Sequence, residues 1–340
     1  MYTNYDLPKY YDLPKWLDDF IFADLGAMIG NDYNKVKNNL NNSSRDNRIY
    51  LGTYFPRTYT EIKTIMDELS EETDYFERQD IRSKSSFRIL SVGCGTGGDV
   101  VSMIDSIREK TGCQNFFVTL IDGNADALEK CKKIISRQKT ENGLKIQTEV
   151  IDKKFIEPSD FQLIAREMCS KKFDFIVTSK FINELIGKFD KLYSRFVTSF
   201  SALLDTTGLI IITDTTDQRA IGENSKDIYI PVLMNSDFND NISADIDIGT
   251  IMPPPCNCQR WIDLSIFLNE YLKTYCCRQC YTSFKNKYSH MDDSHDPRIT
   301  FRIFARKIIQ ERIQYKSIPN TYVVTNKKDG FRGLCKILNS

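Results

Sequence analysis

Apolar residues in the middle of the chain come in short runs, each followed by a stretch with helical spacing. The runs are residues 87–93, 116–122, 144–152, 173–179 and 208–214. Nearly continuous apolar runs of this length are typical of strands that are buried on both faces, as in parallel sheets. Helices are expected between them, beginning near Gly98, Ala125, Ser159 and Asp190. Strands and helices that alternate in this order predict a doubly wound α/β sheet covered on both faces.

The segments on either side of this part have other patterns. Residues 58–72 have apolar side chains at helical spacing, with Thr58 or Thr60 as a possible N-cap, and the Asn-rich residues 34–48 predict a loop. The segment 298–309 is β-like, and a strand that returns so late is expected at the edge of the sheet. The expected parts are a helical N-terminal cap (1–86), a core (87–216), a loop-rich and cysteine-rich insertion (217–298), and a last strand with a basic tail (299–340).

The first apolar run ends in a cluster of glycines, in the sequence Val-Gly-Cys-Gly-Thr-Gly-Gly. A glycine turn between a strand and a helix usually brings the backbone against a ligand. Gly93, Gly95 and Gly98 match the G-x-G-x-x-G pattern of dinucleotide-binding enzymes. With Gly97 in place of Gly98 they match the G-x-G-x-G loop of S-adenosylmethionine enzymes. The loop alone leaves both cofactors open.

Two carboxylates follow at neighbouring strand ends. Asp122 ends the second run and Asp152 ends the third. In a doubly wound sheet the ligand lies across the carboxyl ends of the strands. Asp122 suits the ribose hydroxyls that both cofactors carry, and Asp152 could accept a hydrogen bond from an adenine amino group. The alternatives are a helix N-cap for Asp122 and a solvated turn for Asp152.

This order of elements resembles the class I S-adenosylmethionine-dependent methyltransferases over about residues 87–216 and 299–307. The resemblance implies a mostly parallel, seven-stranded, Rossmann-like sheet with an inserted antiparallel last strand, and S-adenosyl-L-methionine as the cofactor. The glycine loop would pack against the methionine part, Asp122 would hold the ribose and Asp152 the adenine. The expected cofactor contacts are Ser91, Gly93, Cys94, Gly95, Thr96, Gly97, Asp122, Asp152 and Ser179.

One position departs from the family. Ser91 stands two residues before the first glycine, where the family usually has Asp or Glu that helps to hold the methionine ammonium. A hydroxyl there can still organise a water. The departure leaves room for a catalytically silent binding protein that keeps the fold. The dinucleotide alternative lacks a suitably placed acid for hydride transfer, since the two histidines are His290 and His295.

The loop after the fourth strand would face the methyl acceptor. It has neither the Pro-Pro motif of enzymes that methylate amino groups in nucleic acids nor the Pro-Cys of a covalent pyrimidine mechanism. It contains Ser179-Lys180-Phe181 and Asn183-Glu184-Leu185 instead. Lys180, Asn183 and Glu184 are therefore the candidate catalytic residues, with ordinary helix capping as the alternative.

A second resemblance is weaker. The segments 50–69 and 181–185, together with clustered late cysteines, are similar to the mitochondrial small-subunit ribosomal methyltransferase-like family, whose members carry a metal or iron–sulfur centre. The clustered cysteines here are Cys256, Cys258, Cys276, Cys277 and Cys280. The spacing C-x-C and C-C-x-x-C gives two chelating pairs of thiolates, which suit zinc or an iron–sulfur cluster. Reduced thiols without metal are the alternative.

The distribution of charge along the chain bears on which methyl acceptor is expected. The chain has 46 basic and 46 acidic residues, but residues 300–340 have nine basic side chains against two acidic ones. This tail and the second resemblance favour RNA as the acceptor, while a small molecule or a protein stays open. The alternative for the tail is a solvated basic face. No apolar run approaches a membrane span and no signal peptide is recognisable, so a cytoplasmic protein without membrane contact is expected.

Overall fold

The computed structural model describes residues 10–11, 13–29, 39–186, 189–215, 218–219, 228–242, 245–252, 282–283, 285–286, 298–316, 321–325 and 332–336. The clustered late cysteines lie outside these residues. Among the described residues, no helix combines the length and the apolar character that a membrane crossing needs.

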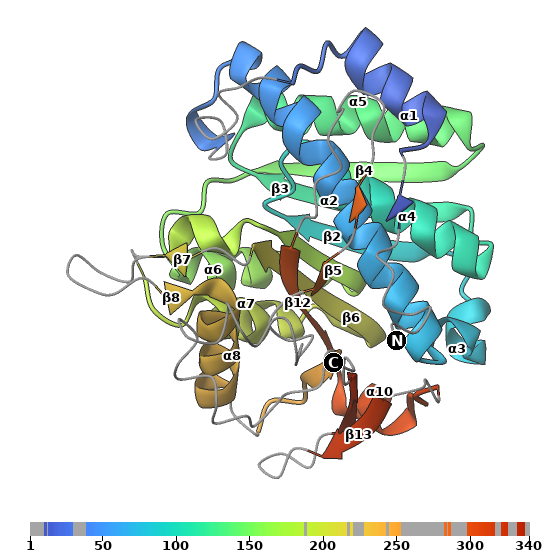
Figure 1. The fold of residues 1–340 in the computed structure, drawn as a ribbon, viewed down its shortest axis with the longest axis vertical. Helices are drawn as coiled ribbons and strands as arrows, with labels where there is room; N and C mark the ends of the chain where they lie inside the picture. Colours follow the sequence, from blue (N-terminus) through green and yellow to red (C-terminus); the bar gives the residue numbers. More distant parts are fainter. Residues whose placement is uncertain are drawn as a thin grey trace, which may run out of the picture.

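The centre of the structure is a mixed, mostly parallel sheet (Figure 1). Its strands are β2 (Phe87–Val92), β3 (Asn115–Asp122), β4 (Lys145–Asp152), β5 (Phe173–Ser179), β6 (Leu204–Thr215), β9 (Gly249–Met252), β10 (Thr282–Ser283) and β12 (Arg298–Ala305). The spatial order is β10-β12-β6-β5-β2-β3-β4, with β9 also paired to β12. The chain moves outward from β2 in one direction through β3 and β4, and in the other through β5 and β6. The switch point between β2 and β5 is where a doubly wound sheet binds its ligand.

Helices cover both faces, as the apolar strands require. The first face is covered by α2 (Ser44–Glu72), α4 (Gly98–Thr111) and α5 (Ala125–Glu141), and the second by α6 (Ser159–Glu167), α7 (Leu192–Ser201) and α8 (Ile230–Asn241). The side chains of successive strand residues point alternately to the two helical layers. Ile89 packs in the core cluster of the first face and Leu90 in that of the second. The predicted doubly wound α/β fold is therefore confirmed.

The remaining elements are short. They are β1 (Tyr10–Tyr11), α1 (Lys15–Asp19), a π-helix (Phe20–Asp24), 3₁₀-helices at Asn39–Asn41, Tyr75–Glu77 and Ile182–Leu185, α3 (Gln79–Arg82), β7 (Gln218–Arg219), β8 (Ile228–Tyr229), β11 (Lys285–Asn286), α10 (Lys307–Arg312), β13 (Thr321–Thr325) and β14 (Arg332–Lys336).

Helix α2 begins earlier than the sequence pattern indicated. Its N-cap is Ser43, whose hydroxyl accepts from Asp46 N (3.2 Å) while the Asp46 carboxylate accepts from Ser43 N (3.1 Å). This capping box satisfies two of the free N–H groups of the first turn. The predicted N-cap at Thr58 or Thr60 was wrong, and so was a loop as far as residue 48. Pro56 lies inside the helix and removes one N–H from its hydrogen-bond ladder. Because proline usually ends or begins a helix, the sequence pattern predicts a helix only after Pro56.

The last long strand is not at the sheet edge. β12 runs antiparallel between β6 and β9, with Ile303 opposite both Ile211 and Met252. The expectation of an edge strand was wrong because the insertion itself supplies β9 and β10, which pair with the outer side of β12. The inserted antiparallel strand that the resemblance implies is present. The described part of the insertion contains the helix α8.

Candidate active site

The glycine loop between β2 and α4 is a tight turn at the switch point. Gly93, Gly95 and Gly97 have φ angles of 69°, 51° and 87°, a region that residues with a Cβ resist. Ile121 O accepts from Gly93 N (2.8 Å) and from Cys94 N (3.1 Å), so the loop is tied to the end of β3. The three glycines of the G-x-G-x-G pattern are therefore required by the backbone itself.

The fourth glycine has a different task. Gly98 is the first residue of α4, and a Cβ on it would lie 2.7 Å from Phe55 O of helix α2. The absence of a side chain lets the cap helix pack directly against the start of α4. The loop and the N-terminal cap thus meet at this position.

Asp122 lies beside the loop. It is 5% exposed, and its two oxygens accept from Gly95 N (2.7 Å) and Asn124 N (2.9 Å). The N-cap of α5 is Asn124, whose side chain accepts from Ala127 N, so the alternative of Asp122 as a plain N-cap does not hold. The carboxylate of Asp122 fixes the loop at the strand end where the ribose is expected.

The other expected cofactor contacts lie along the same edge. Asp152 is exposed at the end of β4, directly opposite Asp122 in the strand register. Cys94 and Thr96 are buried within the loop. Burial, followed by the neighbouring Cys131 thiol, raises the pKa of the Cys94 thiol well above its ordinary value. Ser179 ends β5, and its buried hydroxyl has no hydrogen-bond partner.

A carboxyl group that the sequence pattern did not indicate lies next to Ser91. The Ser91 hydroxyl donates to Asp99 Oδ2 (2.5 Å), and Asp99 is 1% exposed in the first turn of α4. Burial raises the pKa of Asp99 to about 6, although the hydrogen bond from Ser91 lowers it. A carboxyl group thus lies within hydrogen-bond distance of the strand position where the family usually has its acid. The signal was the Gly-Asp pair at the helix start, eight residues after Ser91.

The buried Asp99 carboxyl beside Ser91 predicts a pH dependence of cofactor binding. If Asp99 holds an ammonium group, affinity for S-adenosylhomocysteine should fall about tenfold from pH 7 to pH 5, because a carboxyl with a pKa of about 6 becomes protonated there. Asp99→Asn should bind weakly at both pH values in calorimetry. Asp105→Asn is the matched control, since Asp105 is also buried in α4 but bonds to Tyr59 and Gln138. A wild-type affinity that stays constant over this range would contradict the assignment.

The candidate acceptor loop begins with Lys180. Its φ of 55° is unusual for a residue with a side chain, and its N–H donates to Thr213 O on β6 (2.9 Å). The ammonium group forms an ion pair with Glu61 of helix α2. The cap helix therefore reaches the carboxyl end of β5, which the sequence did not reveal.

Asn183 is bound into a buried cluster. Its amide donates to Asp214 Oδ1 (2.5 Å) and Lys180 O (2.8 Å), and the Tyr193 hydroxyl donates to Asp214 Oδ2 (2.8 Å). Asp214 is fully buried at the end of β6, and this burial raises its pKa to about 6. These bonds fit Asn183 to hold the loop in place. Whether it touches the acceptor stays a prediction.

Aromatic side chains lie near the glycine loop and near the loop after β5. Tyr50 and Tyr54 of α2 lie with ring centroids 5.0 Å apart, and burial together with the nearby Glu184 and Asp122 carboxylates raises the pKa of Tyr50 well above its ordinary value. Phe181 lies against Gly93, where a Cβ would come within 2.3 Å of its ring. Glu184 is half-buried on this side of the loop. The predicted residues Lys180, Asn183 and Glu184 thus share one loop near the glycine turn.

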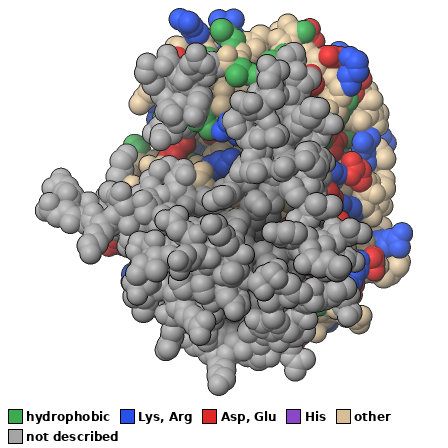
Figure 2. Space-filling model, viewed as in Figure 1, with side chains coloured by type: hydrophobic (Ala, Val, Ile, Leu, Met, Phe, Trp, Pro, Cys, Tyr) green, Lys and Arg blue, Asp and Glu red, His purple; other side chains and the backbone are tan. Residues whose placement is uncertain are grey.

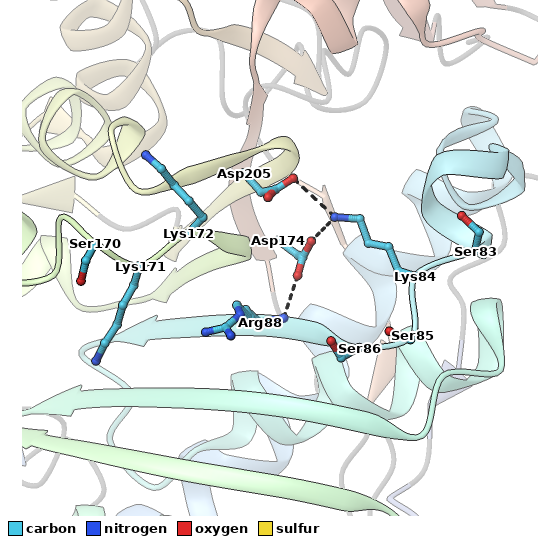
Figure 3. Close-up of a pocket in the computed structure, with 10 residues that line it drawn as sticks. All are labelled: Ser83, Lys84, Ser85, Ser86, Arg88, Ser170, Lys171, Lys172, Asp174 and Asp205. Carbon is cyan, nitrogen blue, oxygen red and sulfur yellow. Dashed lines mark hydrogen bonds and ion pairs between the residues drawn. The ribbon is translucent and has the colours of Figure 1, made fainter.

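A pocket of about 550 Å³ lies at the opposite, amino-terminal end of the sheet (Figure 3). Lys84 forms ion pairs there with Asp174 and Asp205, and Asp174 also accepts from Arg88 N (2.7 Å). These contacts join the starts of β2, β5 and β6. We interpret the pocket as a structural ion network, because its acids are already paired and it lies away from the glycine loop.

The predicted metal ligands Cys256, Cys258, Cys276, Cys277 and Cys280 lie outside the described residues. Within the described ranges, no group of His, Cys, Asp or Glu side chains could hold a metal ion. The zinc or iron–sulfur site therefore stays a prediction from the sequence.

Residues 83–241 match the family model of a methyltransferase domain, and no curated protein matches the chain. Solved structures give weak likenesses. YjhP from E. coli has 14% identity and a TM-score of 0.27, and the match covers 46% of this chain and 48% of that one. An S-adenosylmethionine-dependent methyltransferase from Aquifex aeolicus has 18% identity and a TM-score of 0.30, over 57% of this chain and 91% of that one.

A third likeness is to the enzyme from Thiobacillus denitrificans in complex with S-adenosylhomocysteine, with 14% identity and a TM-score of 0.29, over 62% of this chain and 58% of that one. The chain thus spans about half the length of some structures that it matches. Scores this low carry no weight for the assignment, which rests on the family match and the strand order. Residues 83–241 are therefore a methyltransferase domain with a Rossmann-like fold.

Proposed function

We propose that this enzyme transfers a methyl group from S-adenosylmethionine to a compact acceptor that carries an N–H or O–H group and has no negative charge. The observation that carries the proposal is the acidity of the site. Asp99, Asp122 and Asp214 lie at the loop and strand ends, Glu184 lies on the loop after β5, and Glu61 of α2 lies beside Lys180 of the same loop. The ammonium of Lys180 is paired with Glu61.

The negative charge of these carboxylates favours neutral or cationic methyl acceptors over anionic ones. A phosphate backbone would be repelled by carboxylates at the point of transfer, whereas a neutral or cationic molecule is tolerated or attracted. Carboxylates also accept hydrogen bonds from N–H and O–H groups and can receive a proton. These properties support an amine-like or hydroxyl-bearing acceptor.

The basic tail gives less support to RNA than its composition suggested. Arg302 is 2% exposed and donates to Phe301 O (2.7 Å), and Arg306 bonds to Leu204 O (2.8 Å) and Asp247. Lys316 pairs with Glu77 and donates to Ser70 O (2.7 Å). On the described part of the face in Figure 2, Lys and Arg side chains are interspersed with Asp and Glu. RNA as the acceptor stays a prediction and is the rival outcome of the test.

The residues of this chain have separable tasks in such a reaction. S-adenosylmethionine, when bound, supplies an electrophilic methyl group on a sulfonium sulfur. The loop from Gly93 to Gly97 and the Asp122 carboxylate fit the cofactor, because the glycines lack side chains at a tight turn with positive φ angles and Asp122 fixes that turn. The buried Ser179 hydroxyl without a partner offers a further contact at the end of β5. Tyr50 and Tyr54, whose rings lie 5.0 Å apart, would help to keep water away from the reacting groups.

The test is transfer of tritiated methyl from S-adenosylmethionine into a cell extract, with the products separated by size and treated with RNase or protease. We expect label in the small-molecule fraction, resistant to both enzymes. RNase-sensitive label would overturn the proposal in favour of RNA, and protease-sensitive label in favour of a protein. If no fraction takes up label while the protein binds S-adenosylhomocysteine, the silent binding protein is supported instead.

A further inference from the structure

Helix α2 places a buried carboxylate at the end of the sheet where the acceptor is expected. Glu61 is 1% exposed, and its Oε1 contacts the ammonium of Lys180. Its other oxygen, Oε2, is also buried and has no hydrogen-bond partner. A buried carboxylate oxygen without a donor loses its hydration and gains nothing in return. A ligand that donates a hydrogen bond would remove this penalty.

The backbone of Lys180 is held so that its side chain meets Glu61. The residue has a left-handed φ of 55°, which is strained for a residue with a Cβ. Its N–H is fixed to Thr213 O, and its ammonium lies close enough to Asp214 to lower the pKa of that carboxyl. Strain of this kind persists where the surroundings enforce it, often at functional sites.

Two further polar groups without partners lie at the same place. Ser179 and Thr213 are register partners at the ends of β5 and β6, and the buried hydroxyls of both have no hydrogen-bond partner. By strand alternation they share a face with Val177 and Ile211, which pack in the core cluster that includes Ile62 of α2. Three elements, α2, β5 and β6, thus carry buried polar groups without hydrogen-bond partners near Lys180.

We propose that Glu61 is the general base of the reaction, which receives the proton of the acceptor on Oε2 while Lys180 positions it through Oε1. This inference rests on the proposed function. The Thr213 hydroxyl would orient the acceptor by a hydrogen bond, beside the Ser179 hydroxyl on the cofactor side. The acceptor is accordingly an amine or hydroxyl compound small enough to reach the carboxyl ends of β5 and β6 beneath the cap helix.

Methyl transfer to the acceptor forms one bond to carbon and breaks one. The lone pair of the acceptor nitrogen or oxygen forms the new bond to the methyl carbon, and the electron pair of the broken carbon–sulfur bond stays on sulfur. The acceptor proton passes to Glu61 Oε2, so the positive charge of the sulfonium and the negative charge of the carboxylate disappear together. Glu61 returns the proton to solvent when the product leaves.

The electrostatic surroundings of Glu61 suit a general base. Burial raises the pKa of Glu61 above its ordinary value, and the charges of Lys180 and Arg57 offset only part of that rise. A carboxylate of raised pKa is a stronger base, and a positioned general base typically contributes about 100- to 10,000-fold to the rate.

The experiment compares Glu61→Gln with Glu68→Gln, since Glu68 is also buried in α2 but lies two turns further from the loop. Methyl transfer is measured with tritiated S-adenosylmethionine and the small-molecule fraction of the extract. Glu61→Gln should lower the rate at least 100-fold and leave S-adenosylhomocysteine affinity within threefold, while Glu68→Gln should retain the rate. Glu61→Asp, which keeps the charge, should fall between them and serves if Glu61→Gln does not fold.

A second measurement is independent of turnover. In protein labelled with ¹³C at the glutamate carboxyls, the resonance that is absent from Glu61→Gln should titrate above the ordinary glutamate range in the complex with S-adenosylhomocysteine. A Glu61 carboxyl that titrates in the ordinary glutamate range would overturn the role of Glu61 and leave the proposed function standing. Wild-type rates in Glu61→Gln and Glu61→Asp would do the same. No transfer to small molecules by the wild type would overturn both.

Discussion

Asp122→Ala should lose S-adenosylhomocysteine binding by at least about 100-fold while the protein stays folded. The carboxylate of Asp122 accepts from Gly95 N and Asn124 N, so its removal frees the glycine loop and deletes the group expected to hold the ribose. Each charge-assisted hydrogen bond of this kind contributes about 1.5–3 kcal/mol, so two or three lost together exceed a hundredfold change. Calorimetry measures the affinity, and circular dichroism checks the fold.

Asp122→Asn is the matched control for that experiment. The amide keeps one acceptor oxygen and the size of the side chain but loses the charge, so its affinity should lie between those of the wild type and Asp122→Ala. Wild-type affinity in Asp122→Ala would exclude Asp122 from cofactor binding.

Gly93→Ala should destabilise the protein by about 2 kcal/mol or more and abolish cofactor binding. The φ of 69° is strained for alanine, and the new Cβ would lie 2.3 Å from the Phe181 ring. The unfolding midpoint in urea measures the loss of stability. Gly112→Ala separates the two causes, because Gly112 has a φ of 76° but open space around its Cβ position.

Gly112→Ala should show the strain alone, about 1 kcal/mol, with normal S-adenosylhomocysteine affinity. Equal losses of stability and unchanged affinity in both variants would mean that the contact between Gly93 and Phe181 does not shape the site.

The sheet was predictable because its information is local. Each strand is an apolar run with a turn or helix signal at its end, and the starts of α4, α5 and α6 at Gly98, Ala125 and Ser159 agree with the predicted ones. α7 begins at Leu192 instead of Asp190. The predicted domain boundaries stay predictions, since no observation tests them.

What could not be predicted depends on contacts between distant segments. Asp99 and Ser91 form one unit only because the loop folds α4 back over the end of β2. Glu61 meets Lys180 across 119 positions in the chain, and no periodicity indicates that contact. The position of β12 inside the sheet likewise depends on partners that the insertion supplies. The cofactor contacts stay predictions from the sequence, and the contact of the cap helix with Lys180 was missed.

Calorimetric titration of the full chain with S-adenosylhomocysteine, in parallel with NAD⁺, tests the central claim most directly. We predict one S-adenosylhomocysteine bound per chain, lost in Asp122→Ala, and no binding of NAD⁺. A wild-type protein that binds NAD⁺ or neither compound would contradict the assignment of the glycine loop to S-adenosylmethionine.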